Sequence, residues 1–431
     1  MVTLLIIADD FTGALDTGVK FAAIGADVRV VTDFEYEFKR TEDSVQVLVL
    51  DAETRHIDGK KAYDRVYLIV KKAKEAGISY IYKKTDSALR GNIGSELSAV
   101  IDAAGAQVLH FLPAFPKMGR TTREGIHYIN NVPVEESVFG KDPFEPVACS
   151  SIPEIIKKQS QINVRVVTDG KVVKKGEERL KCDEFPLLAV YDAQTDEELE
   201  HIAKRLSEYG ELSVVAGCAG MAETLPKLLG LTGTLPNIPR YIPRLLVACG
   251  SVNPITKSQL DYAEQNGFNR IRLTPQEKLE PGYFDTLAGM ERVRELENQC
   301  KESRCCILDT NDEEGSQNTL EYARRHGIEL EVLRLRIATT LGYLVKSLVD
   351  CGVESTLLIT GGDSLLGFMN QIQVYEMTPV CEIAPGTVLS QFEIYGKTYH
   401  VISKSGGFGS KTLMVDLADK IISENEEKTL C

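Results

Sequence analysis

Two adjacent carboxylates, Asp9 and Asp10, directly follow an apolar run from Leu4 to Ala8. The run predicts a strand buried on both faces, which is typical of a parallel sheet covered by helices. In open α/β sheets, ligands bind beyond the carboxyl ends of the strands. Two acids at that edge can bind substrate hydroxyls, coordinate a metal ion or accept a proton. The alternative is that Asp10 caps the helix that begins near Thr12, a role that Asp fills well.

A second polar group lies in the run YKKTDSALRGNIGSEL, from Tyr82 to Leu97, after a strand predicted over 78–82. Cations with hydroxyl and amide donors beside an acid suit a polar, anionic substrate. The alternative is a charged loop in which the amide side chain caps a helix. The candidate residues are Lys83, Lys84, Asp86, Ser87, Arg90 and Asn92.

Two further arginines are candidate cations. Arg55 follows the strand predicted over 45–50, so it emerges from the same edge of the sheet and can grip a carboxylate with both arms of its guanidinium. Arg120 lies in the run FPKMGRTTREG, which we interpret as part of a long loop. Arginines in loops are more often solvated, so Arg120 is the weaker candidate of the two.

The second half of the chain contains three glycine-rich turns. ACGSVNPIT ends a strand and opens a helix, LLITGGDSLLG repeats that arrangement, and SKSGGFGSKT follows near the end. Phosphate can approach a backbone closely only where glycine removes the Cβ, so the three turns together predict a nucleotide phosphate site. The candidate residues are Ser251, Gly361, Gly362, Asp363, Ser364, Lys404, Gly406 and Gly407.

Two familiar nucleotide motifs are absent. The third turn departs from a P-loop because the required G-K-[ST] adjacency is missing. No G-x-G-x-x-G follows the first strand of either half, which argues against a dinucleotide-binding dehydrogenase.

The elements that must position these residues alternate between strands and helices, which predicts βαβ units and parallel sheets. We predict an α/β fold of two tandem domains, 1–232 and 245–431, joined by a proline-rich linker at 233–244, with an active-site cleft between them. Helices are expected over 59–75, 94–104 and 412–423, a long functional loop over 113–147 and a hairpin within 388–403. The remaining predicted strands are 4–8, 28–32, 108–112, 245–248, 270–273, 305–308 and 356–359.

Composition narrows the class of protein. The net charge of −14 over 431 residues argues against a nucleic-acid or anionic-membrane partner, because both demand a basic face. No stretch approaches the length of a transmembrane helix, and the first residues lack the basic region of a signal peptide. Ten cysteines without metal-site spacing predict a reducing, cytoplasmic location.

Five motifs in order, ADDFTGALDTGVKFA, KKTDSALRGNIGSEL, PAFPKMGR, GGDS and KSGGFG, resemble the four-carbon acid sugar kinase family. The resemblance covers almost the whole chain. It implies an amino-terminal domain that binds a sugar acid and a carboxyl-terminal domain that binds ATP. It further implies substrate contacts at Asp10, Arg55 and the stretch Lys83-Lys84-Thr85-Asp86, and ATP contacts at Ser251, Gly361 to Ser364 and Gly407.

The resemblance implies transfer of phosphate from ATP, with Mg²⁺, to the terminal hydroxyl of a four-carbon acid. The pattern is closer to the D-threonate and D-erythronate kinases than to the 3-oxo-tetronate kinases, although Ser364 stands where Thr is usual. Asp363 is our candidate for the general base and Asp10 its rival, while the metal ligands stay unassigned. The alternatives are a 3-oxo-tetronate 4-kinase and a sensor that binds nucleotide and sugar acid without transfer. A homo-oligomer is compatible with the sequence, which determines neither the oligomeric state nor the stereochemistry of the acid.

Overall fold

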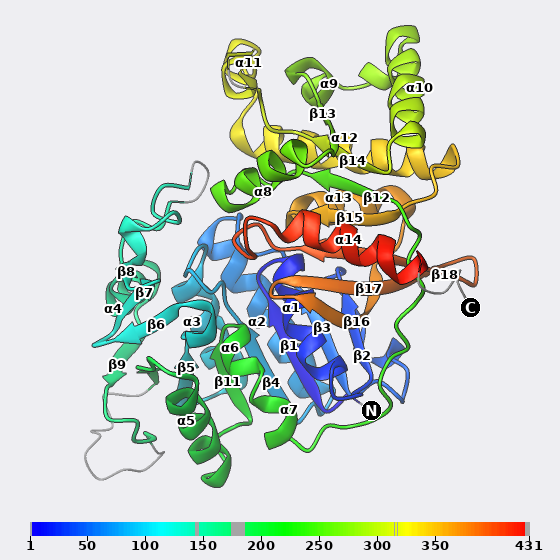
Figure 1. Ribbon diagram of the computed structural model, residues 1–431. Helices are drawn as coiled ribbons and strands as arrows, with labels where there is room; N and C mark the ends of the chain where they lie inside the picture. The colour runs from blue at the N-terminus through cyan, green and yellow to red at the C-terminus, as the bar shows by residue number, and fades with distance from the viewer. Residues whose placement is uncertain (1, 143–145, 174–185, 314, 317, 427–431) are drawn as a thin grey trace. The chain divides into compact units, whose positions relative to one another are not determined.

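The computed structural model describes residues 2–142, 146–173, 186–313, 315–316 and 318–426 (Figure 1). The chain divides into two compact units, Met1–Pro236 and Asn237–Cys431. Each unit contains a sheet with parallel strands and helices that connect them. The predicted class of two α/β units with largely parallel sheets is therefore confirmed.

The sheet of the first unit is built from parallel pairs throughout its described strands, and its central strands are apolar and fully buried. Strands that neighbour each other in a parallel sheet place their carboxyl ends side by side at one edge. The order is β2 (Val28–Val31), β3 (Val47–Asp51), β1 (Leu4–Ala8), β4 (Tyr80–Lys84), β11 (Val214–Gly217), β5 (Val108–Leu112), β10 (Leu187–Tyr191) and β9 (Asn163–Val167).

The helices of the first unit follow from apolar stripes at helical spacing. The helix predicted over 59–75 is confirmed as α2 (Gly59–Glu75), in which Ala62, Val66, Ile69 and Ala73 form one buried face. The other helices are α1 (Phe11–Ala22), α3 (Ile93–Ala104), α4 (Ile152–Gln159), α5 (Asp196–Glu208), α6 (Ala219–Ala222) and α7 (Leu225–Leu228).

Two predictions for the first unit were wrong in detail. The predicted loop over 113–147 contains a small antiparallel sheet, β6 (Arg120–Arg123), β7 (Ile126–Ile129) and β8 (Val132–Pro133). Two residues with positive φ form each of its turns, Glu124-Gly125 and Asn130-Asn131, and such pairs favour tight hairpins. The strands are too short to show an alternation of apolar and polar residues in the sequence. Strand β4 also ends two residues later than predicted, at Lys84.

In the sheet of the second unit, the first four pairs of neighbouring strands are parallel and the last two are antiparallel, in the order given at the end of this paragraph. The predicted hairpin is confirmed, with Tyr395 and Gly396 at positive φ forming its two-residue turn. The order is β13 (Asn269–Arg272), β14 (Cys305–Asp309), β12 (Leu245–Cys249), β15 (Thr356–Thr360), β18 (Lys397–Lys404), β17 (Thr387–Ile394) and β16 (Glu376–Ala384).

The helix predicted within ACGSVNPIT is confirmed and begins at a capping residue. The Asn253 side chain accepts a hydrogen bond from the backbone of Ile255, and Pro254 is the first residue of α8 (Pro254–Gln265). The helix predicted over 412–423 is α14 (Leu413–Glu426). The others are α9 (Pro275–Leu279), α10 (Leu287–Glu302), α11 (Thr319–Arg325), α12 (Leu330–Asp350) and α13 (Gly362–Ile372).

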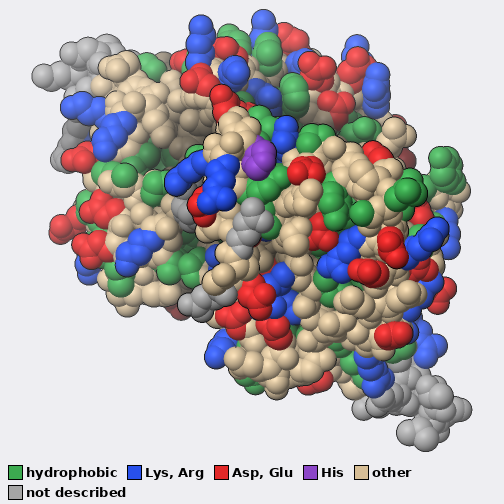
Figure 2. Space-filling view, turned by 90° about the horizontal axis from the view of Figure 1, so that it is seen from above, with side chains coloured by type: hydrophobic (Ala, Val, Ile, Leu, Met, Phe, Trp, Pro, Cys, Tyr) green, Lys and Arg blue, Asp and Glu red, His purple; other side chains and the backbone are tan. Residues whose placement is uncertain are grey.

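The surface carries charge of both signs. On the face in Figure 2, basic and acidic side chains are interspersed, with apolar side chains between them. Across the described residues, no helix combines the length and apolar character needed to span a bilayer.

Candidate active site

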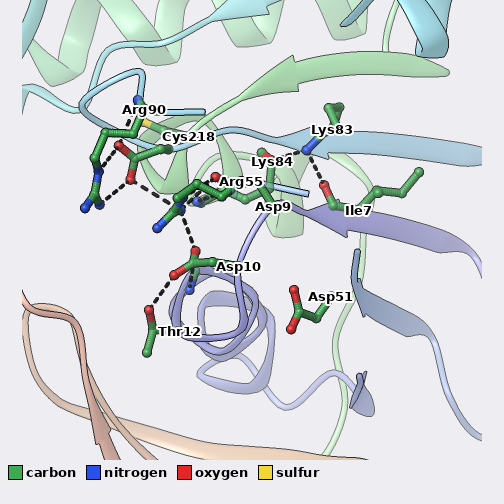
Figure 3. Close-up of polar contacts among 12 residues, drawn as sticks. Ile7, Asp9, Asp10, Thr12, Asp51, Arg55, Lys83, Lys84, Arg90 and Cys218 are labelled. Atoms are coloured by element: carbon green, nitrogen blue, oxygen red, sulfur yellow. Dashed lines mark hydrogen bonds and ion pairs between the residues drawn. The ribbon is translucent and has the colours of Figure 1, made fainter. Parts of the chain in front are cut away.

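Three neighbouring strands of the first unit, β3, β1 and β4, deliver six charged side chains to one edge of the sheet (Figure 3). We call this group the strand-end cluster. Its acids and bases come from the loops after these strands or, for Lys84, from the last strand position. The members are Asp9, Asp10, Arg55, Lys84, Asp86 and Arg90.

Arg55 lies at the centre of the strand-end cluster and contacts three carboxylates. Its Nε donates to Oδ2 of Asp9 at 2.7 Å, and its Nη2 donates to Oδ1 of Asp10 at 2.7 Å. The same Nη2 lies 3.4 Å from Oδ1 of Asp86. The Arg55 side chain is only 7% exposed, so the planar guanidinium fixes the positions of these acids in a desolvated setting.

Asp86 and Arg90 form a second, forked ion pair. Arg90 donates from Nε and Nη2 to the two carboxylate oxygens of Asp86, at 2.9 and 2.8 Å. Burial by itself raises the pKa of Asp86, but the positive charges of Arg90 and Arg55 outweigh burial and hold that pKa well below its usual range. The Asp86 carboxylate is therefore ionised at neutral pH.

Asp10 serves as both helix cap and cluster member. Its Oδ1 accepts from the backbone of Gly13 at 3.1 Å, which caps α1, and its Oδ2 accepts from the Thr12 hydroxyl at 2.7 Å. Burial raises the pKa of Asp10, but Arg55 and Lys84 reverse the shift, so this pKa is lowered overall. The capping role of Asp10 is thus confirmed, and it does not exclude a role at the site, because the capping carboxylate also contacts Arg55.

The strand-end cluster combines three carboxylates with three cations at a largely buried end of the sheet, where Asp10 and Arg90 are the partly exposed members. Carboxylates accept hydrogen bonds from hydroxyl groups, and Arg and Lys donate to a carboxylate or phosphate. The group can therefore bind a small molecule that carries both hydroxyls and an acid, since each kind of group finds its complement there.

Lys83 lies outside this arrangement. Its ammonium is fully buried, donates to the backbone carbonyls of Ile7 and Lys84, and forms an ion pair of 2.8 Å with Oε2 of Glu96. Since β4 continues to Lys84, the two lysines point to opposite faces of the sheet. Lys84 reaches the cluster, 3.8 Å from Oδ1 of Asp9, and Lys83 packs against α3.

Asn92 joins the site's framework without capping α3. Its side-chain amide donates to the carbonyls of Thr54 and Ile57 at 2.8 Å each, which ties the loop after β4 to the loop that carries Arg55. No side-chain bond of Asn92 caps the helix. The capping alternative raised from the sequence is therefore wrong.

Arg120 and Ser87 lie beside the cluster. Arg120 is buried in β6, and its guanidinium carbon is 5.9 Å from the Phe139 ring centre, while that of Arg90 is 5.3 Å from the same ring. The carbonyl of Ser87 accepts from Nε2 of His127 at 2.9 Å, and burial lowers the pKa of His127 to about 4. Thr85 is fully buried, and its backbone NH donates to Gly217.

Sequence reasoning missed Glu96, His127 and Phe139. A signal existed for Glu96, because it falls among Ile93, Leu97 and Val100 on the apolar face of α3. None existed for His127, which lies in β7 of the small sheet, or for Phe139, which follows that sheet in the segment predicted as a loop.

In the second unit, the turns after β12 and β15 and the loop after β18 converge. A Cβ placed on Gly250 would lie 1.9 Å from Oγ of Ser364, and one on Gly406 would lie 2.5 Å from Oγ of Ser251. Gly361 has φ +101°, which favours glycine, and a Cβ placed on it would lie 3.4 Å from the backbone N of Ser251. Helices α8 and α13 therefore direct their amino-terminal ends toward one place, where backbone NH groups attract an anion.

Side chains of α8 hold the loop after β18 in this position. Thr256 donates to the carbonyl of Gly406 at 2.8 Å, and Gln259 donates to those of Phe408 and Ser410. Beneath the loop, Lys404 is fully buried and donates to Oγ1 of Thr256 at 3.2 Å. Burial lowers the pKa of Lys404 to about 8.

Asp363 is in the first turn of α13, and its Oδ2 lies 3.6 Å from Nε of Arg334 on α12. The second unit fits a nucleoside triphosphate, because glycines without a Cβ let the three turns approach one another closely and the two helix ends favour negative charge. A carboxylate at that edge, such as Asp363, also suits Mg²⁺, which proteins bind through one or two carboxylates together with substrate phosphates. The third glycine turn lacks the G-K-[ST] sequence of a P-loop, but the three turns together still form a site that suits phosphate.

Comparison with known proteins defines the class. A profile described as a sugar-binding N-terminal domain matches residues 4–225, and one described as a nucleotide-binding C-terminal domain matches residues 246–414. A solved structure of a Salmonella typhimurium protein has the same fold, with a TM-score of 0.71 and 20% identity over 96% of this chain and 98% of the other. The protein thus combines a sugar-binding unit with a nucleotide-binding unit.

The relatives identify the family. The D-threonate kinase of Salmonella typhimurium is 30% identical over 96% of this chain and 97% of its own length. The D-erythronate kinase of Heliobacterium modesticaldum is 25% identical over 100% and 99% of the two chains. Others are named 3-oxo-tetronate kinase. The chain belongs to the four-carbon acid sugar kinase family, as its five motifs indicated, and it is an enzyme of the kinase class.

Proposed function

We propose that this enzyme uses ATP to phosphorylate the 4-hydroxyl of a four-carbon sugar acid, D-threonate or D-erythronate, to the 4-phosphate. The observation that carries the proposal is the strand-end cluster, in which Arg55 contacts the carboxylates of Asp9, Asp10 and Asp86 beside Lys84 and Arg90. Such a group complements a hydroxylated acid. The names of the relatives support the choice of substrate.

Within the strand-end cluster, we assign the cations Lys84, Arg90 and Arg55 to the substrate carboxylate and the acids Asp9, Asp10 and Asp86 to its hydroxyls. Arg120 is a further cation for the acid group, and Thr85 and Ser87 are further candidates for hydroxyl contacts. Asn92 and Lys83 take positioning roles, because their polar groups are engaged with the framework.

The nucleotide is assigned to the second unit. We propose that the backbone of Ser251, of Gly361 to Ser364, and of Gly406 and Gly407 contacts the phosphates, with Lys404 supporting the loop from below. Mg²⁺ accompanies the nucleotide, with Asp363 as our candidate ligand or base. When bound, it supplies charge stabilisation to the transferred phosphoryl group.

A carboxylate near the reacting hydroxyl can accept its proton as attack proceeds. Asp363 is our candidate base, and Asp10 is the second, because its lowered pKa keeps it ionised. If Asp363→Asn retains the wild-type kcat at saturating ATP and acid while Asp10→Asn loses it, the base is Asp10.

The proposed function is tested by measuring ADP release with MgATP across a panel of D- and L-threonate, D- and L-erythronate and the 3-oxo-tetronates. We expect turnover with D-threonate or D-erythronate and a kcat/KM at least tenfold lower for the 3-oxo acids. The reverse preference would make the enzyme a 3-oxo-tetronate kinase. Tight binding of an acid and of ATP without turnover of any acid would make it a sensor.

A further inference from the structure

A cavity of about 450 Å³ in the second unit is separate from the residues proposed to contact the phosphates. It lies between α9, α11 and the first turns of α12, and its volume is typical of small-molecule sites. Its aromatic and aliphatic lining comes from α9 and α11, from the residues that directly follow each of them, and from the start of α12. These residues are Leu279, Pro281, Tyr322, His326, Ile328 and Val332.

The lining suits a flat, uncharged group. Tyr322 and His326 stack with ring centres 4.1 Å apart and an interplanar angle of 22°, and Tyr322 donates from its hydroxyl to Oε1 of Glu280 at 2.6 Å. Two acids, Glu280 and Glu329, and one cation, Arg336, also line the cavity, so a phosphate or a sugar acid would meet a net negative charge there. An aromatic ligand gains from the rings and the aliphatic wall without this penalty.

The cavity connects to the phosphate turns through a chain of contacts. Asn311, after β14, donates to the carbonyl of Ser251 at 3.1 Å. The buried ammonium of Lys278 donates to the carbonyl of Thr310 at 2.9 Å, and the next residue, Leu279, is in the cavity wall. These contacts run without a break from Ser251 in the first glycine turn to Leu279 in the cavity wall.

Helix α12 joins the same two places. Near its start, Arg336 donates to the carbonyl of Leu279 at 2.9 Å, while Arg334 lies 3.6 Å from Asp363 in the phosphate turn after β15. Deeper in the helix, Leu341 comes within 3.6 Å of a Cβ placed on Gly250. One rigid helix therefore contacts both the cavity wall and the glycine turns.

We infer that this cavity binds the purine base of ATP, with the base against the Tyr322 and His326 rings and the phosphates at the glycine turns. The inference rests on the proposed use of ATP by this unit. It makes Tyr322, His326 and Val332 determinants of nucleotide affinity that carry no part of the phosphate contacts.

The chain contains no tryptophan, so one introduced tryptophan gives an unambiguous fluorescence signal. In His326→Trp, we expect ATP to quench the fluorescence and tripolyphosphate, which lacks a base, to leave it unchanged. Val349→Trp near the other end of α12 is the control and should respond to neither ligand.

A second variant measures affinity. Val332→Trp fills the cavity and should weaken ATP binding at least tenfold in calorimetry, while the Kd of tripolyphosphate and the KM of the sugar acid stay within twofold. Val332 and Val349 are 38% and 42% exposed, so Val349→Trp is a matched control for folding.

Three outcomes would overturn the inference. These are unchanged ATP binding in Val332→Trp, equal weakening of ATP and tripolyphosphate, or no quenching in His326→Trp under conditions where ATP binds. Each can occur while ADP release with the sugar acid continues, so failure of the base site is distinguishable from failure of the kinase proposal.

Discussion

Lys83 and Glu96 form an ion pair of 2.8 Å between Nζ and Oε2, and both side chains are almost completely removed from solvent. The pair joins β4 to α3 directly beneath the strand-end cluster. Burial and the nearby charge of Asp9 raise the pKa of Glu96, while Lys83 opposes that shift. Because the Lys83 ammonium and the Glu96 carboxylate are buried and paired with each other, neither is available to a ligand.

Removing one partner of this pair should destabilise the fold. We expect Glu96→Gln to lower the free energy of unfolding by about 3–5 kcal/mol, because it leaves the Lys83 ammonium buried without a counter-charge. Urea unfolding measures the loss, and the double variant Lys83→Met with Glu96→Leu should recover most of it. A stable Glu96→Gln protein whose KM for the sugar acid rises tenfold would instead place Lys83 among the substrate contacts.

Arg55 should tolerate no replacement, including lysine. Arg55→Lys keeps the positive charge but loses the planar fork that contacts Asp9 and Asp10, so kcat/KM for the acid should fall about 100-fold. The Kd of ATP should stay within twofold. Arg65→Lys is the control, since Arg65 donates to the carbonyls of Ala52 and Glu53 in the same loop and lies outside the cluster. Equal losses in both variants would show that the effect comes from the loop and not from the fork.

The glycine turns should be sensitive to a single methyl group. In Gly250→Ala the new Cβ would lie 1.9 Å from Oγ of Ser364, so we expect the Kd of both ATP and tripolyphosphate to rise at least tenfold. Adding Ser364→Ala removes that oxygen and leaves a Cβ contact of 3.2 Å, which should restore part of the affinity. Unchanged binding in Gly250→Ala would mean that the phosphates lie elsewhere.

Lys404 should couple nucleotide binding to a proton. Its pKa of about 8 lies below the ordinary lysine value of 10.5, so the free protein loses this proton as the pH rises through 8. The unfolded chain keeps this proton up to about pH 10.5. Between pH 8 and about 10.5 the unfolded state therefore binds more protons than the folded state, so the contribution of Lys404 to the free energy of unfolding rises with pH. A triphosphate nearby favours the ammonium, so ATP binding at pH 8.5 should take up a proton.

Calorimetry in buffers of different ionisation enthalpy measures this uptake. We expect none at pH 6.5, where Lys404 is already charged, and none in Lys404→Met at either pH. Equal uptake at pH 8.5 in wild type and Lys404→Met would assign the proton to another group.

The framework of the site was predictable from sequence because strand ends carry the information. Apolar runs located β1, β3 and β4, and the parallel fold then brought Asp10, Arg55 and Lys84 together without further assumptions. The three glycine turns were likewise expected at one edge, since two follow strands and open helices.

The remaining details depend on which face of a strand each side chain takes and on tertiary packing, and neither can be read from single residues. Lys83 and Lys84 look alike in sequence, and only the true end of β4 decides which one faces α3. The small sheet from β6 to β8 was missed because strands of two to four residues show too little periodicity, and the contacts of His127 in β7 were missed with it.

The central claim is transfer of the γ-phosphate of ATP to the 4-hydroxyl of the acid. It is tested most directly by the phosphorus NMR spectrum of the product from D-threonate or D-erythronate. We expect one phosphomonoester signal coupled to the two protons of a CH₂ group, formed in equal amount with ADP. A signal coupled to a single proton would place the phosphate on a secondary hydroxyl, and ADP formed with inorganic phosphate alone would show hydrolysis. Either result would contradict the account.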